Sequence, residues 1–232
     1  REREREEDVL DLSGRDLPGV SGLDSEAYRS VSDLNLADNC ISKVSFPLPL
    51  RLEVLDLSHN LLSPSFSVPH TMANLLSLDL SHNRIRSITP LTKCSSLVSL
   101  SISHNEIRNL TGLEALKSLQ CLDVSYNNLT SLSTLRNLTH NTALHTLSLT
   151  GNGLTSCKRY RTMVNTILPS LCVLDSLVLR RGGRGYKYSL DSVSRTPGVV
   201  RGLPEPKSPA YPGVDSVRRM REKYTEKERE AE

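Results

Sequence analysis

The sequence predicts an α/β solenoid. Short parallel strands line the concave face of a right-handed superhelix, a helical cap closes its C-terminal end, and an extended tail follows. The hexapeptide LDLSHN occurs twice, at residues 55–60 and 78–83, and near-copies follow at residues 100–105 (LSISHN) and 122–127 (LDVSYN). Leucines alternate with polar residues inside each copy, as they do in a strand with one buried face. After Asp175 the composition changes, and proline, glycine and arginine become frequent. These observations indicate a repeating strand domain and a separate tail.

The copies belong to a longer repeat. The frame L-x-x-L-x-L-x-x-N-x-L fits the chain six times, and successive asparagines recur at a spacing of 21 to 25 residues. These asparagines are Asn39, Asn60, Asn83, Asn105, Asn127 and Asn152. An earlier degenerate copy, VLDLSGRDL, has Arg15 in the asparagine position. Six copies in phase are the signature of a leucine-rich repeat, whose units bury their apolar faces by stacking on one another.

The physical chemistry of the frame predicts about seven short parallel strands in one sheet. Leu55 and Leu57 point to one side of a strand, whereas Asp56 and Ser58 point to the other. The inward positions are Leu34, Leu36, Leu55, Leu57, Leu78, Leu80, Leu100, Ile102, Leu122, Val124, Leu147 and Leu149. Each asparagine follows a strand, where its amide is expected to bond backbone groups that the ladder leaves free. The return of the chain along the convex side is short enough to be a 3₁₀ turn.

A helical cap is predicted at residues 155–175. Tyr160, Val164, Ile167 and Leu168 recur at helical spacing, Pro169 ends the helix, and one last half-repeat follows. Short repeats of about 22 residues that close in Y-R-x-x-V-x-x-x-L-P-x-L-x-x-L-D resemble the intracellular leucine-rich-repeat proteins with a helical C-terminal cap. That group includes a phosphatase-1 regulatory subunit, a spliceosomal subunit and ciliary or axonemal proteins. Secreted relatives carry cysteine-rich caps, which this chain lacks.

Histidines occupy the position before the asparagine in three successive repeats. His59, His82 and His104 are expected to stack along one edge of the concave face, roughly 5 Å apart, with Asp38 before them and Tyr126 after them. Histidines beside carboxylates suit zinc in residue type, but equivalent residues of stacked repeats stand in a line, whereas a metal needs ligands that converge. We therefore predict no metal site and no cofactor.

The concave face is predicted to be a protein-docking surface. It is polar, mildly acidic and rich in aspartate, serine and histidine, although such a face also serves solubility alone. Its candidate binding residues are Asp56, Ser58, His59, Asp79, Ser81, His82, Ser103, His104, Asp123 and Tyr126. No nucleophile elbow, phosphate loop or H-E-x-x-H motif occurs. The sequence therefore predicts a protein without enzymatic activity.

The tail differs in charge from the repeat domain. Residues 176–232 carry a net charge of +5, and the chain before them carries −2. We divide the chain into a charged extension (1–7), the repeat domain (8–175), a basic extended tail rich in proline and glycine (176–213) and a helix (214–232). Tail anchoring is assigned to Arg180, Arg181, Arg184, Val217, Met220 and Tyr224. The segment RRGGRG also suits RNA, since arginine-rich segments order on nucleic acid.

These features together predict an intracellular adaptor or scaffold. The solenoid holds one protein partner, and the tail attaches the chain to a multi-subunit assembly. By resemblance, the first expectation is a structural component of a ciliary or flagellar axoneme, among cytoskeletal, microtubule-associated proteins. The alternatives are a ribonucleoprotein subunit and a regulatory subunit of protein phosphatase 1. The five scattered cysteines favour reduced thiols inside a cell, and the chain has no apolar run long enough to span a membrane.

Overall fold

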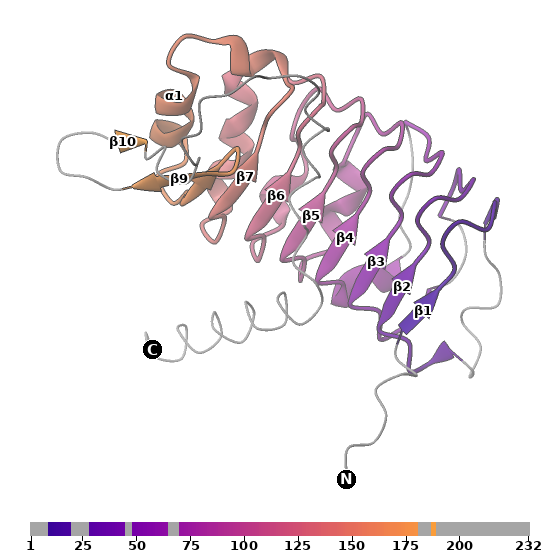
Figure 1. Cartoon of the computed structure of the whole chain (residues 1–232). Helices are drawn as coiled ribbons and strands as arrows, with labels where there is room; N and C mark the ends of the chain where they lie inside the picture. Colours follow the sequence, from indigo (N-terminus) through magenta and orange to yellow (C-terminus); the bar gives the residue numbers. More distant parts are fainter. Residues whose placement is uncertain (1–8, 20–27, 45–47, 65–69, 181–186, 189–232) are drawn as a thin grey trace, which may run out of the picture.

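The computed structural model describes residues 9–19, 28–44, 48–64, 70–180 and 187–188. These residues form one open sheet in which ten short strands follow one another in chain order (Figure 1). The strands are β1 (Val9–Asp11), β2 (Asp33–Asn35), β3 (Val54–Asp56), β4 (Ser77–Asp79), β5 (Ser99–Ser101), β6 (Cys121–Asp123), β7 (Thr146–Ser148), β8 (Val173–Leu174), β9 (Leu177–Arg180) and β10 (Lys187–Tyr188).

Strands β1 to β8 are parallel, so the described residues contain eight parallel strands where the sequence predicts about seven. The register places a leucine beside a leucine at every step. This row consists of Leu10, Leu34, Leu55, Leu78, Leu100, Leu122, Leu147 and Leu174. All twelve positions predicted to point inward are buried at 2% exposure or less, which confirms the predicted core.

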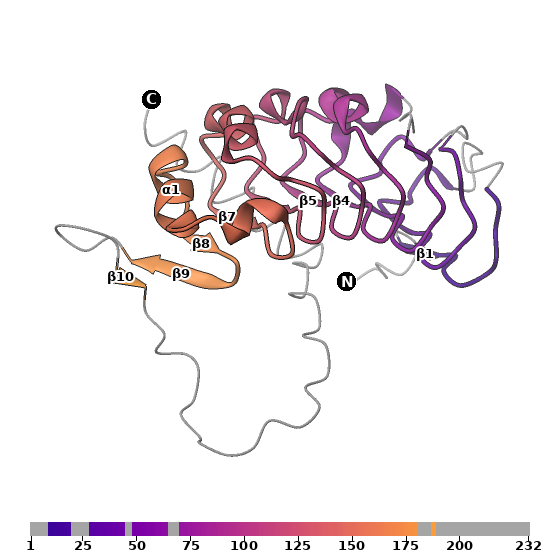
Figure 2. The same cartoon turned by 90° about the horizontal axis from the view of Figure 1, so that it is seen from above.

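The opposite side of the core is closed by short helices. They are the 3₁₀ helices η3 (His70–Asn74), η4 (Thr89–Lys93), η5 (Leu113–Ala115), η6 (Leu132–His140) and η7 (Gly153–Ser156), followed by the α-helix α1 (Tyr160–Ile167). Figure 2 shows the 3₁₀ helices η3 to η6 along one side of the molecule and the strands along the other. Leucines such as Leu91, Leu113 and Leu135 are buried between the two layers. The predicted 3₁₀ return is therefore confirmed.

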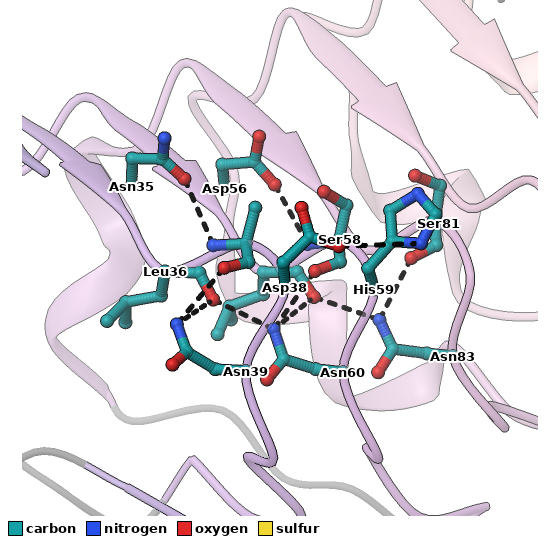
Figure 3. Close-up of polar contacts among 12 residues, drawn as sticks. Asn35, Leu36, Asp38, Asn39, Asp56, Ser58, His59, Asn60, Ser81 and Asn83 are labelled. Carbon is teal, nitrogen blue, oxygen red and sulfur yellow. Dashed lines mark hydrogen bonds and ion pairs between the residues drawn. The ribbon is translucent and has the colours of Figure 1, made fainter. Parts of the chain in front are cut away.

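The frame asparagines fasten each turn to the preceding repeat. The amide oxygen of Asn60 accepts a hydrogen bond from the backbone N–H of Ile41 at 2.9 Å. Its amide nitrogen donates to the carbonyl of Leu36 at 2.9 Å, and to two carbonyls of its own turn, at Leu57 and Ser58 (Figure 3). The same links to the preceding repeat recur at Asn39, Asn83, Asn105, Asn127 and Asn152. The predicted role of the asparagines is thus confirmed.

A helix forms where the sequence predicts one, and Asp175 joins it to the last repeat. Oδ1 of Asp175 accepts a hydrogen bond from the backbone N–H of Leu149 at 2.8 Å, and Oδ2 accepts one from the Tyr160 hydroxyl at 2.5 Å. In the repeat before, the equivalent N–H, that of Val124, donates to a strand carbonyl. The carboxylate of Asp175 therefore replaces the strand carbonyl where the parallel ladder ends.

The sheet continues beyond the point at which the sequence analysis ended the repeat domain. Strand β9 pairs antiparallel with β8, and β10 pairs antiparallel with β9. Leu179 is buried and belongs to the main core. The boundary drawn after Asp175, with an extended tail from 176, is wrong in this respect, because β9 packs on the end of the core. None of the helices in the described ranges is long and apolar enough to cross a bilayer.

Candidate functional site: a column of rings on the concave edge

Four rings form a column along the edge of the sheet. The ring centroids of His59 and His82 lie 4.0 Å apart, those of His82 and His104 lie 4.1 Å apart, and Tyr126 follows at 4.3 Å from His104. The interplanar angles are 11°, 11° and 16°, so the rings are stacked face to face. This confirms the predicted row, with Tyr126 continuing the histidines. The stacking arises because one position of the frame recurs at the spacing of neighbouring strands.

The backbone explains which residues occur in this column. Every residue directly before a frame asparagine has a left-handed conformation, with φ between 51° and 74°. These residues are Asp38, His59, His82, His104, Tyr126 and Gly151. Aspartate, histidine and glycine tolerate this region better than most residues do. Histidine therefore has a backbone reason to occupy the position, and its recurrence does not in itself require chemistry.

Gly151 provides the space that ends the column. A Cβ atom at this position would lie 2.5 Å from Cδ1 of Tyr126, which is closer than two carbon atoms can approach. The Tyr126 ring therefore lies over a position that only glycine can occupy without displacing it. Sequence reasoning missed this role, although the change from Tyr126 to Gly151 in one position of the frame is visible in the sequence.

The column is accessible from solvent. The side chains of His59 and Asp38 are 50% and 68% exposed, and Nδ1 of His59 lies 3.9 Å from Oδ1 of Asp38. That contact is an ion pair when the imidazole is protonated. Tyr126 is 47% exposed at the other end. The column thus presents ring edges to solvent between an aspartate and a tyrosine, an arrangement that suits contact with another protein.

The aspartates beside the column have a structural role of their own. Oδ1 of Asp56 accepts a hydrogen bond from the N–H of Ser58 at 2.8 Å (Figure 3), and Asp79 and Asp123 bind Ser81 and Ser125 in the same way. These Asx turns hold the chain as it leaves each strand. Burial raises the pKa of the Asp79 carboxyl, and the hydrogen bonds from Ser81 oppose this rise without cancelling it.

The predicted serines are less accessible than the rings. Ser58, Ser81 and Ser103 are buried, and their carbonyl oxygens accept hydrogen bonds from the frame asparagines. Asp123 is buried as well, whereas Asp56 and Asp79 are half-buried. The structure therefore brings all ten predicted concave residues onto one face, but it leaves the rings as the most exposed part of that face.

A second, small apolar cluster lies directly before strands β4 and β5 and was missed by sequence reasoning. Leu76 and Val98 are each 2% exposed and form a cluster separate from the main core. The sequence contained a signal for this pair. Of the six copies of the frame, only these two have an apolar residue directly after the first frame position. Beside them, the Ser99 hydroxyl is buried without a hydrogen-bond partner in the described part of the chain.

The described residues hold no group of three histidine, cysteine, aspartate or glutamate side chains that could bind a metal ion. Stacked imidazoles present their nitrogens along a column, whereas a zinc ion needs ligands around a point. Among the residues assigned to tail anchoring, Arg180 ends β9. Arg181, Arg184, Val217, Met220 and Tyr224 lie outside the described residues.

Comparison with models of known protein families gives a match over half of the chain. A family model described as "Leucine-rich repeat" matches residues 67–186, just over half of the chain. A second model, described as "Leucine Rich Repeat", matches residues 51–75. Tsukushi-A of Xenopus laevis is 40% identical over 84 residues, which cover 34% of this chain and 24% of that protein. The chain thus spans about a quarter of the length of this curated relative.

Several solved structures are similar to this chain. An internalin (inlF) from Listeria monocytogenes is 21% identical with a TM-score of 0.48, and the match covers 64% of this chain and 48% of that one. Internalin C2 from the same species is 23% identical with a TM-score of 0.47, and the match covers 72% and 79%. A leucine-rich-repeat protein of Leptospira interrogans is 23% identical with a TM-score of 0.47, and the match covers 64% and 44%.

Proposed function

The chain belongs to the leucine-rich repeat family, and on that basis we propose that it is a non-enzymatic scaffold that binds a protein partner on its concave face. The observation that carries the proposal is the exposed column from Asp38 to Tyr126, set beside a row of carboxylates. Solenoids commonly bind partners on an extended concave surface, and tyrosine and histidine edges supply both apolar contact and hydrogen bonds.

The charge of this face indicates the chemistry of the partner. The outward positions in and around strands β2 to β7 include Asp33, Glu53, Asp56, Asp79 and Asp123. None of the outward positions of these described strands is lysine or arginine. A partner surface that carries basic side chains and at least one apolar side chain is therefore favoured, because like charges across an interface are costly.

We further propose that the assembly is a ciliary or flagellar axoneme and that the protein is intracellular. The support is the resemblance of the short repeats and the closing residues 160–175 to capped intracellular relatives, together with the absence of a cysteine-rich cap in that stretch. The basic segment around Arg180, Arg181 and Arg184 and the stripe of Val217, Met220 and Tyr224 are the proposed anchors to the assembly.

Capture of the partner by the tagged full chain tests the docking surface. We expect the double variant His82→Ala, Tyr126→Ala to lose the protein that the wild type retains, while its melting temperature stays close to that of the wild type. The matched control is Arg86→Ala, which removes an exposed ion pair to Glu106 away from the column and is expected to retain the partner. Equal capture by the double variant and the wild type would contradict the proposal.

The proposed location is tested separately by sedimentation of the full chain with isolated axonemes. Reversing Arg180, Arg181 and Arg184 to glutamate is expected to reduce sedimentation at low salt, because exposed charge contacts are screened as salt rises. Met220→Asp is expected to reduce sedimentation at low salt and at high salt alike. A wild-type chain that stays in the supernatant would argue against an axonemal role and leave the docking surface untouched.

A further inference from the structure

A long stretch of the chain near the C-terminal end of the solenoid is basic and contains no acidic residue. The chain has no aspartate or glutamate between Asp123 and Asp175. The lysines and arginines of this stretch are Arg136, Lys158, Arg159 and Arg161. The outward positions of strands β2 to β6 carry carboxylates and no lysine or arginine. One solenoid therefore carries opposite charge on its concave face and in its last part.

The fold gathers these cations on the cap. Lys158, Arg159 and Arg161 surround the start of α1, and α1 packs against η6, which carries Arg136. All four residues are exposed, and Figure 2 places α1 at the end of the solenoid, beyond β7. Consecutive Cα atoms are about 3.8 Å apart, so residues 158 to 161 lie within about 11 Å of one another. This distance is comparable with the Debye length of about 8–10 Å, and the three charges at α1 therefore act together.

The described part of the chain does not neutralise this charge. Lys158, Arg159 and Arg161 form no ion pair with a carboxylate among the described residues. The nearest acid in the sequence is Asp175, and its two oxygens accept hydrogen bonds from the Leu149 N–H and the Tyr160 hydroxyl. Its carboxylate is thus used inside the cap. The three cations at α1 are available to a ligand from outside.

An exposed methionine adds an apolar contact to the basic cluster. Met163 is 45% exposed, and its N–H donates to the carbonyl of Arg159 at 3.0 Å. It therefore follows Arg159 by one helical turn, the spacing at which two side chains are neighbours on a helix. Methionine adapts its shape to the surface that it contacts. We call Lys158, Arg159, Arg161 and Met163 the cap patch.

The chemistry of the cap patch favours a polypeptide over a nucleic acid or a membrane. Single-stranded nucleic acids bind by stacking their bases on exposed aromatic rings, whereas the aromatic residue within this segment, Tyr160, is only 6% exposed. Stable attachment to a bilayer needs more apolar surface than one half-exposed methionine offers. Carboxylates, in contrast, form bidentate pairs with arginine, and an apolar side chain next to them would contact Met163.

We propose that the cap patch is a docking surface for an acidic segment of another protein, in which glutamate or aspartate residues alternate with apolar ones. This surface goes beyond the proposed function, because it is separate from the concave face and takes a ligand of the opposite charge. It is also independent of the anchors assigned to the tail. The solenoid can then hold a basic partner on its concave face and an acidic partner on its cap at the same time.

Fluorescence anisotropy with the purified full chain and a labelled peptide of repeated Glu-Glu-Leu tests this surface. We expect the peptide to bind, with an affinity that falls as salt rises, and a peptide of repeated Gln-Gln-Leu not to bind. The triple variant Lys158→Gln, Arg159→Asn, Arg161→Gln is expected to raise the Kd for the acidic peptide roughly tenfold, because exposed charge pairs are individually weak and three are lost together. Asparagine tolerates the φ of 60° at position 159, so the melting temperature should stay close to that of the wild type.

A matched control removes the same amount of charge elsewhere. Lys43→Gln, Arg84→Gln, Lys117→Gln changes three exposed basic residues outside the cap patch and is expected to bind the acidic peptide as the wild type does. Met163→Ser is expected to weaken binding a few-fold at low salt and at high salt alike, since an apolar contact is not screened. Equal losses in the cap variant and the control, or a wild-type chain that does not bind the peptide, would overturn the proposal.

Oligouridylate and phosphatidylserine vesicles distinguish the other possible ligands. If either one binds the wild type more tightly than the acidic peptide does and is lost in the cap variant, the ligand is not a protein and the proposal is wrong. The concave variant His82→Ala, Tyr126→Ala is expected to bind the acidic peptide normally. If partner capture ignores that concave variant while the cap variant still loses the peptide, only the proposed function is wrong and the cap patch stands.

Discussion

At the scale of single residues, the left-handed backbone position before each asparagine is the feature that determines the side chains of the ring column. Histidine, aspartate and glycine occupy this position because they tolerate its φ values. Tyr126 has the same left-handed conformation although tyrosine is not favoured there, and its ring has space because Gly151 lacks a side chain. The column is therefore produced by backbone conformation together with the spacing of the strands.

Replacing Gly151 by alanine tests this account. Alanine at a φ of +74° is strained and its Cβ would contact the Tyr126 ring, so we expect a loss of about 1–3 kcal/mol in the free energy of unfolding. In a Tyr126→Ala background only the backbone strain remains, and the loss should be smaller. Gly153→Ala, whose Cβ meets nothing closer than 3.4 Å, is the control and should change stability little. Equal losses in both backgrounds would show that the ring does not matter.

Asp79 predicts a dependence of stability on pH. Burial raises the pKa of its carboxyl in the folded chain above the ordinary value of 3.8. The folded chain therefore binds more protons between the two pKa values, and stability falls as the pH rises through that window. Asp79→Asn keeps an oxygen that can accept from Ser81, as Asn35 does for Ala37 in the same row.

The melting temperature of Asp79→Asn is therefore expected to equal or exceed that of the wild type at neutral pH. The difference should shrink as the pH falls toward 3.8, where the wild-type carboxyl is protonated in the folded chain. Asp79→Ala lacks the acceptor and should melt lower than either. Thermal melts across this pH range measure the effect. If the melting temperature of Asp79→Asn rose further above that of the wild type at low pH, the prediction would be contradicted.

At the scale of elements, the C-terminal end is closed by helix α1, strand β8 and strand β9 together. Asp175 joins the helix to the last complete repeat through Tyr160 and Leu149. Strand β9 covers the last parallel strand and buries Leu179. Strand β9 therefore pairs the backbone groups that β8 would otherwise leave free at the end of the parallel ladder.

A chain that ends at Asp175 is therefore expected to melt at a lower temperature than one that ends at Tyr188. The first lacks β9 and exposes the core under Leu179, whereas the second keeps every described strand. In the full chain, Leu179→Ala should cost about 2 kcal/mol or more, as other large-to-small core substitutions do. Val178→Ala, at a position that is 57% exposed, should be close to neutral. Identical melting of the two truncated chains would show that β9 contributes nothing.

The elements differ in how far the sequence predicts them. The leucine and asparagine positions were predicted because one periodic signal is repeated in six copies, so each copy supports the others. Strand β9 was missed because the segment LVLR occurs once, outside the repeat, and runs into the arginines and glycines of residues 181–185. The roles of Gly151, Leu76 and Val98 depend on contacts between repeats, and these can be recognised only once the register is known.

At the scale of the whole molecule, the core is one continuous layer that extends from β1 to β9. Each repeat contacts its neighbours through the leucine row, the ladder and the asparagines, so stability is shared along the chain. A defect in a central repeat therefore separates the two halves of the core, whereas a defect on the concave face leaves the core intact.

Leu100→Asp is the test of this continuity. Leu100 lies in register between Leu78 and Leu122 and is fully buried, so an unpaired carboxylate there should abolish the single cooperative unfolding transition. The control is Leu61→Asp, which puts the same carboxylate at a position that is 42% exposed. This control should fold, and it should lose far less free energy of unfolding than Leu100→Asp does. A soluble Leu100→Asp chain with a normal melting curve would contradict the assigned core.

The direction of the ladder also decides how the protein responds to tension. The hydrogen bonds between neighbouring parallel strands run along the long axis of the solenoid, so a force that pulls its two ends apart loads them one row at a time. Neighbouring strands are only ~4.8 Å apart, yet a released repeat of about twenty-two residues extends to roughly 75 Å. Under load the chain would lengthen in a series of large yielding steps, repeat by repeat, and behave as an extensible tether.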